Sequence, residues 1–152
     1  MRIYFFEKVK MIDFQVGNVD MPALDADKVW TWLCAVAASH GYQLSKVSYR
    51  FCNDEEILEA NRQFVGHDYY TDIITFDYTR GDCAAGDILI SLDTVASNAS
   101  GMGIPFATEL RRVIAHGVLH LCGINDKSPE ERAVMEKAEN DALALWNSMF
   151  EN

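Results

Sequence analysis

The segment Arg111–Asp126, RRVIAHGVLHLCGIND, constrains the fold of this chain more than any other part of the sequence. Apolar side chains dominate the first part of the segment and its approach, at Leu110, Val113, Ile114, Val118, Leu119 and Leu121. A helix that is apolar on nearly all sides is a buried helix. We therefore expect a helix over Pro105–Cys122 at the centre of the fold, with the rest of the chain packed around it.

This predicted helix carries two histidines, His116 and His120, four residues apart. At about 100° per residue they share one face, one turn apart, so both imidazoles can reach a single metal ion. Gly123 occupies the position of a helix-ending left-handed residue, and Asp126 follows it three residues later. A chain that turns back there would bring the Asp126 carboxylate to the open side of the same ion. Ordinary polar residues on a helix can also have the histidine spacing, but the added glycine and oxygen ligand favour a metal site.

Gly117 stands where metalloproteases of the HExxH type carry the glutamate that acts as general base. Peptide hydrolysis by that route therefore lacks its base. A glycine in the middle of a helix costs about 1 kcal/mol relative to alanine. A close approach of backbone or substrate at this point would account for it.

The run HGVLHLCGIND resembles the signature of the YbeY family, which reads roughly HGxLHLxGYDH. The similarity extends upstream, because Tyr70–Phe76 (YTDIITF) is similar to the family's PTDVLSF, and Gly86–Ile88 to its LGDI element. Together these motifs cover about Asn61–Asp126. The chain departs from the family pattern at Asp126, which replaces the third histidine.

A second departure from the family is Val65, which replaces an arginine thought to contact substrate phosphate. Among the nearby cationic or titratable residues, Arg62, His67 and Arg80 are the candidates to compensate, and their alternative is a solvated surface position. Asp72 and Asp87 are candidates to orient a ligating imidazole, and capping a strand or turn is their equally good alternative.

The resemblance implies a single-strand-specific, metal-dependent endoribonuclease that matures the 3′ end of small-subunit 16S ribosomal RNA and serves ribosome quality control. It implies His116 and His120 as catalytic residues and one zinc ion held by His116, His120 and Asp126. The implied partners are precursor ribosomal RNA and the small ribosomal subunit, with its proteins or an associated GTPase, and neither DNA nor a membrane. The nucleophile would be metal-activated water or the 2′-OH of the RNA, and the sequence does not choose between them.

Two other classes of function remain open. One is a metal-dependent hydrolase of other substrates on the same scaffold, which the missing glutamate base disfavours. The other is a non-catalytic ribosome assembly factor whose metal only stabilises the fold, an alternative that the departures at Val65 and Asp126 keep open.

Length and composition bound the class of protein. The 152 residues, 49% hydrophobic and 24% charged, predict one globular domain over 1–152. The N-terminal run is broken by charges and offers no signal peptide, no apolar run approaches membrane-spanning length, and the four cysteines have no paired spacing. We expect a cytoplasmic protein with reduced thiols. The net charge of −10 counts against a simple nucleic-acid binder, because RNA affinity comes largely from Lys and Arg.

Periodicity and capping signals predict the remaining elements. We expect strands at Met1–Phe6, Leu44–Cys52, Asp72–Tyr78 and Gly86–Ser91, the last two as a hairpin, and a loop or irregular strand over Met11–Val19. Helices are expected from a cap at Asp25 or Asp27 to Ser39, from Asn53 to Gly66, over Asp93–Ser100 with Gly101 closing it, and after Ser128. This order predicts an α+β domain, a small four-stranded mixed sheet packed against about five helices, with the histidine helix innermost. The alternative is a compact α/β sandwich whose last strand is not paired with its neighbour.

Overall fold

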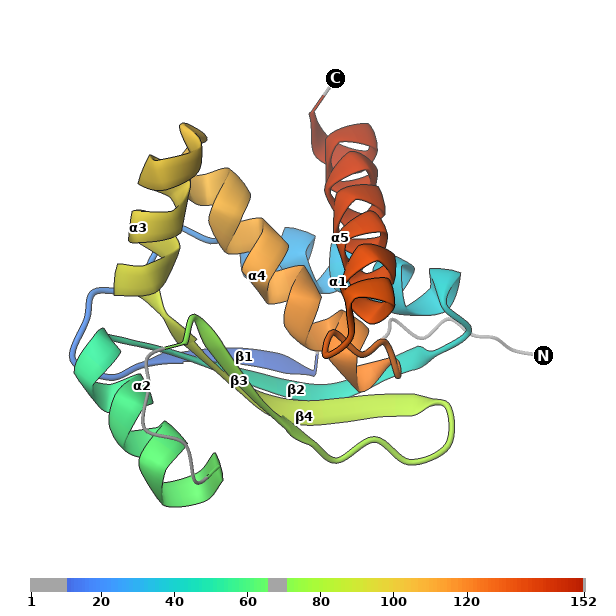
Figure 1. Ribbon diagram of the computed structural model, residues 1–152. Coiled ribbons are helices and arrows are strands. Elements are labelled where there is room, and N and C mark those ends of the chain that lie inside the picture. Colours follow the sequence, from blue (N-terminus) through green and yellow to red (C-terminus); the bar gives the residue numbers. More distant parts are fainter. Residues whose placement is uncertain (1–10, 66–70, 152) are drawn as a thin grey trace.

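Four strands form one mixed sheet in the computed structural model, which describes residues 11–65 and 71–151. The strand order is β1-β2-β4-β3, with β1 parallel to β2, β2 parallel to β4, and β3 antiparallel to β4 (Figure 1). The strands are β1 (Ile12–Val16), β2 (Gln43–Cys52), β3 (Ile73–Asp77) and β4 (Cys83–Ser91). The predicted hairpin is confirmed, and its antiparallel pairing excludes the sandwich with an unpaired last strand.

Five α-helices lie within the described residues, and most of them cover one face of the sheet (Figure 1). The helices are α1 (Ala26–Ser39), α2 (Asp54–Ala60), continued by a π-helical turn η1 (Asn61–Val65), then α3 (Leu92–Met102), α4 (Phe106–Leu121) and α5 (Pro129–Phe150). Of the elements that the structure describes, only α2 and η1 lie against the other face, over a small cluster formed by Cys52, Ile57 and Ile74. The predicted α+β class is confirmed. None of the described helices is both long and apolar enough to cross a membrane.

The central position of α4 is confirmed as well. Its residues Ile114, Ala115, Val118 and Leu119 are completely buried, in a core shared with α1, α5 and the sheet. The hydroxyl of Tyr49, on β2, donates a 2.8 Å hydrogen bond to the carbonyl of Ile114. Backbone and side chains therefore both fix how the histidine helix lies on the sheet.

At Gly117, α4 approaches the sheet closely. A Cβ built on this glycine would lie 2.7 Å from Cδ1 of Ile88 on β4 and 3.3 Å from Cδ1 of Ile73 on β3. The close approach that the sequence suggested is therefore packing of the helix on the strands. Because α4 packs closely on the sheet here, β3 lies next to the part of α4 that carries the histidines.

The caps of the helices follow the predicted signals. Asp25, rather than Asp27, caps α1 by accepting from the backbone N–H groups of Asp27 and Lys28. Ser128 and Glu131 form a complete capping box at the start of α5, with Pro129 in its first turn. Because α5 is anchored at this end, the loop between α4 and α5 is held at both ends.

The edge strand β1 is more regular than the sequence predicted. Met11–Val19 was expected to be a loop or an irregular strand, but Ile12–Val16 pairs in regular parallel register with Val47–Phe51 of β2. Strand identity here depends on a partner about 35 residues away, which local pattern does not reveal. The strand predicted at Met1–Phe6 lies outside the described residues.

One smaller expectation was wrong. Helix α3 continues past Gly101 to Met102, and Gly103 with φ +66° ends it. Two further features concern aromatic side chains. Phe64, on η1, is 64% exposed, whereas Trp30 and Trp32 on α1 are both buried, and Trp32 donates to the carbonyl of Ala142 on α5.

Candidate functional site

The turn after α4 brings Asp126 back to His116. Gly123 has φ +87°, and its N–H donates to the carbonyl of His120 at 3.0 Å, while Ile124 N–H donates to Leu119 at 3.1 Å. This left-handed helix end reverses the chain. Asp126 Oδ2 then lies 3.2 Å from His116 Nε2.

The two histidines and the aspartate line one pocket. His116 and His120 have nearly parallel rings, with 6° between their planes and 6.4 Å between their centres. The pocket, of about 270 Å³, lies between α4, the turn and the start of β3 and is lined by Thr71, Asp72, Ile73, Thr75, His116, His120 and Asp126. Sequence segments more than 40 residues apart thus meet here, and the lining is mostly polar.

Both imidazoles are bonded through Nδ1. His116 Nδ1 lies 2.6 Å from Oε2 of Glu139, on α5, and His120 Nδ1 lies 3.1 Å from the backbone carbonyl of Ile124. A carbonyl or a carboxylate accepts, so these two contacts favour the tautomer with the proton on Nδ1 in both rings. In the neutral rings, Nε2 is then the nitrogen with a free lone pair on each histidine.

The charges around His116 are almost all negative. Burial lowers the pKa of His116, but the hydrogen bond and charge of Glu139, followed by the charges of Asp126 and Asp72, outweigh burial and leave this pKa raised. Burial raises the pKa of the Asp72 carboxyl, and the nearby His116 opposes that rise. The pocket is therefore an environment that favours a cation.

The chemistry of these side chains fits a divalent metal ion. Two imidazole nitrogens and a carboxylate oxygen are a common zinc ligand set, and the second nitrogen of each ring is already held by an acceptor, as ligating histidines usually are. Within residues 11–65 and 71–151, no group of three His, Cys, Asp or Glu side chains has the spacing of a complete metal site. His116 and Asp126 are in contact, whereas His120 stands one turn further along α4.

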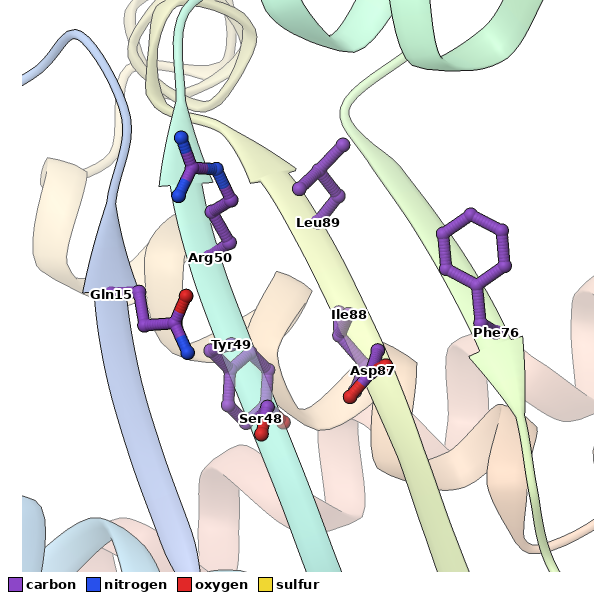
Figure 2. Close-up of a pocket in the computed structure, with 8 residues that line it drawn as sticks. All are labelled: Gln15, Ser48, Tyr49, Arg50, Phe76, Asp87, Ile88 and Leu89. Atoms are coloured by element: carbon purple, nitrogen blue, oxygen red, sulfur yellow. The ribbon is translucent and has the colours of Figure 1, made fainter. Parts of the chain in front are cut away.

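Asp72 and Asp87, the two candidates to support a histidine, lie on opposite sides of the sheet. Asp72 lines the histidine pocket. Asp87 projects from the open face of the sheet, beside Ser48 and Phe76, in a second pocket of about 240 Å³ (Figure 2). Its neighbour on β4, Ile88, points to the other side, toward Gly117 of α4. Asp87 therefore does not orient either imidazole.

The candidates to replace the family arginine at Val65 receive little support. Arg62 lies on η1, with its guanidinium 3.7 Å from Glu59. Arg80 belongs to the turn between β3 and β4, where its backbone pairs with that of Cys83 in an isolated antiparallel β-bridge. Neither lines the histidine pocket. His67 lies outside the described residues.

Glu139 is the residue of this site that sequence reasoning missed. It comes from α5, 23 residues after His116, and its side chain is only 13% exposed. Arg112, one turn before His116 on α4, contacts the other oxygen of the same carboxylate at 3.2 Å. The available signal was a glutamate on the mainly apolar side of α5, directly after the buried Ala138.

Comparisons with known proteins agree with this architecture. A family model described as Endoribonuclease YbeY matches residues 12–147. A protein named Endoribonuclease YbeY from Bacteroides thetaiotaomicron is 54% identical over 134 residues, which cover 88% of this chain and 98% of the relative. Relatives with the same name come from Phocaeicola vulgatus, 56% identical over 89% of this chain and 98% of the relative, and from Flavobacterium psychrophilum, 39% identical over 90% and 97%.

A solved structure shares the fold. The solution structure of a Thermotoga maritima protein superposes with a TM-score of 0.59 and 24% sequence identity, covering 93% of this chain and 95% of that one. The arrangement of sheet and helices described above is thus also found in a protein of known structure.

Proposed function

Because the chain belongs to the YbeY family of endoribonucleases, we propose that it is a metal-dependent endoribonuclease that cleaves single-stranded precursor ribosomal RNA. In this proposal the substrate is the 3′ end of 16S RNA in immature small subunits, and the same activity serves ribosome quality control in the cytoplasm. The observation that supports it most directly is that His116, His120 and Asp126 line one polar pocket in a member of this family.

In the proposed site, His116, His120 and Asp126 hold one divalent ion, and zinc suits the two imidazoles best. A bound metal supplies Lewis-acid stabilisation of phosphate charge and lowers the pKa of a coordinated water. Glu139 and the Ile124 carbonyl keep the two rings presenting Nε2. Asp72, directly before the first residue of β3, adds a partly buried carboxyl to the same pocket.

The proposed preference for single strands has a geometric reason. A phosphodiester in an A-form duplex is held in the helical backbone and does not swing easily into a concave pocket, whereas a single strand can bend into it. The pocket lies beside the turn Gly123–Asp126 and between α4 and the start of β3, so an RNA strand would have to bend locally to enter it.

The metal itself is tested first. Crystals grown with zinc should show an anomalous peak at the zinc edge within bonding distance of His116, His120 and Asp126. A peak absent from that position in zinc-supplied crystals would refute the metal site.

The activity is tested with zinc-loaded protein on a precursor that carries the 16S 3′ end, in single-stranded and duplex form. We expect cleavage of the single strand only, loss of cleavage on chelation, and loss in His120→Ala. The melting temperature of His120→Ala, measured with and without zinc, separates catalysis from a structural metal. If this variant matures ribosomal RNA normally and only melts earlier with zinc present, the protein is an assembly factor with a structural metal.

A further inference from the structure

The imidazole of His116 lies between two carboxylates. Glu139 Oε2 is 2.6 Å from Nδ1, and Asp126 Oδ2 is 3.2 Å from Nε2. A neutral imidazole has one proton and therefore donates to only one of the two. The shorter contact is the one to Glu139, so the structure favours the form in which Nδ1 carries the proton.

The choice of tautomer decides whether His116 can bind a metal. With the proton on Nδ1, the lone pair of Nε2 points to the side where Asp126 lies. With the proton on Nε2, the ring donates to Asp126 instead, and the nitrogen that faces the pocket is blocked. Asp126 alone would therefore select the wrong form of the ring.

Arg112 keeps Glu139 suited to this task. Its Nη1 lies 3.2 Å from Oε1 of Glu139, the oxygen that does not face His116, and 3.3 Å from Oδ1 of Asn140. Its Nε also lies 3.2 Å from the buried carboxylate of Glu109. A carboxylate oxygen accepts hydrogen bonds, and a contact with a guanidinium holds the carboxylate in place. One oxygen of Glu139 is thus fixed by Arg112, and the other is aimed at Nδ1.

We propose that Glu139, held by Arg112, is a positioning residue that sets the tautomer of His116 so that its Nε2 is open to a metal ion. This inference rests on the proposed function, because it assigns a role toward the metal of that same site. It also makes α5 a part of the site, although the ligands themselves come from α4 and the turn that follows it.

The two ligating rings are then oriented in different ways. The ring of His120 is fixed by a backbone carbonyl of the turn, which no side-chain substitution removes. The ring of His116 depends on a side chain from another helix. Substitutions of Glu139 should therefore change His116 and leave the tautomer of His120 as it is.

The experiment compares the parent protein with Glu139→Ala and Glu139→Gln, and uses Glu136→Gln as the matched control. Glu136 lies one turn earlier on α5 and is exposed, so this control removes the same charge near the same place. Two-bond ¹H–¹⁵N correlation spectra of the metal-free proteins, at a pH where the rings are neutral, report the tautomer of each histidine. Competition titration against a chelator reports zinc affinity.

We expect the Nδ1–H form for His116 in the parent and in Glu136→Gln, and the Nε2–H form in Glu139→Ala. Zinc affinity should fall about 10- to 100-fold in Glu139→Ala. Glu139→Gln should lie between them, because its amide oxygen still accepts but without a charge. This isosteric variant also keeps the test decisive if the alanine variant fails to fold.

An unchanged His116 tautomer and unchanged zinc affinity in folded Glu139 variants would overturn the inference. A purely structural role for Glu139 would lower the melting temperature without moving the tautomer, and would overturn it too. A parent protein that binds no zinc would refute the proposed metal site, but the tautomer comparison needs no metal and would still show whether Glu139 sets the ring.

Discussion

Asp126 is the residue at which this chain departs most clearly from the family signature, and its carboxylate still lies beside His116. The carboxylate lies 3.2 Å from His116 Nε2, on the side where a third ligand of the proposed metal ion would lie, and its side chain is 37% exposed. A larger side chain therefore has room at this place in the turn.

For that reason we predict that Asp126→His folds and binds zinc at least as tightly as the parent. A neutral imidazole suits zinc, and the substitution restores the third histidine of the family motif. Titration of both proteins against the same chelator measures the difference, with Asp126→Ala as the variant that removes the ligand. Weaker zinc binding in Asp126→His than in the parent would mean that the surroundings are built for a carboxylate.

At the residue scale, sequence spacing predicted only what lies on one continuous piece of chain. His116, His120, Gly123 and Asp126 belong to one helix and its closing turn, so their proximity follows from helix geometry. Glu139 reaches the site across a contact between two helices, and no spacing along the sequence encodes that contact. Its contact with His116 exists only because α4 and α5 pack together.

At the scale of elements, two effects oppose each other at Gly117, where α4 contacts the sheet: helix propensity and close packing. Replacing this glycine by alanine gains about 1 kcal/mol of helix propensity. The new methyl group would meet buried Ile88 at 2.7 Å, and overpacking of this kind costs about 1–3 kcal/mol. We predict that Gly117→Ala is less stable than the parent by about 1 kcal/mol, measured by urea unfolding.

Gly101, inside α3, provides the matched control for this prediction. A Cβ at Gly101 would meet no atom of the described residues within 4 Å, and the backbone there is helical. Gly101→Ala should therefore stabilise the protein by about 0.5–1 kcal/mol. If Gly117→Ala stabilised the protein as Gly101→Ala does, helix propensity, and not the contact with the sheet, would decide both substitutions.

The capping box of α5 gives a prediction about pH. The carboxylate of Glu131 accepts from the backbone N–H groups of Ser128 and Lys127, and these hydrogen bonds lower its pKa from the ordinary 4.5. A lowered folded-state pKa stabilises the protein above the unfolded-state value, and that contribution is lost as pH falls through the folded-state value. Thermal unfolding of the parent should therefore show a loss of stability below about pH 4.5 that is smaller in Glu131→Gln.

Glu130→Gln is the control for the capping box, because it removes a charge from the same first turn without removing a cap. It should keep the acid dependence of the parent. Equal acid dependence in Glu131→Gln and in the parent would show that the box contributes nothing to stability. Because α5 also carries Glu139, loss of the capping box should weaken the contact between Glu139 and His116 as well as the start of the helix.

Element boundaries with local signals were predicted well, and those that depend on distant partners were not. Asp25, Asn53 and Ser128 mark helix starts by their own capping chemistry, and the hairpin of β3 and β4 is continuous in sequence. By contrast, Ile12–Val16 is a strand because β2 offers it a parallel edge, and parallel partners are never adjacent in sequence. Local sequence patterns likewise did not predict the strand order β1-β2-β4-β3.

At the scale of the whole molecule, charge and topology together limit how this protein can meet RNA. The formal net charge is −10, and the described residues that line the histidine pocket include neither Lys nor Arg. Phosphate neutralisation by cationic side chains supplies most non-specific affinity. Because the described lining of this pocket offers no cationic side chain to phosphate, we expect the attraction there to come from a bound metal or from a partner that presents the RNA strand.

We therefore predict that the zinc-loaded protein cleaves naked RNA slowly and requires the immature small subunit, or a protein bound to it, for efficient cleavage. Few cationic contacts also mean that binding of naked RNA should depend only weakly on salt, because each neutralised phosphate contributes about 0.7 to the slope of log K against log salt for single strands. The measurement compares cleavage of a naked precursor 3′ end with cleavage of the same end inside immature small subunits, at matched ionic strength. Equal rates in the two settings would show that the partner is dispensable, and a steep salt dependence with naked RNA would place a basic binding surface elsewhere on the chain.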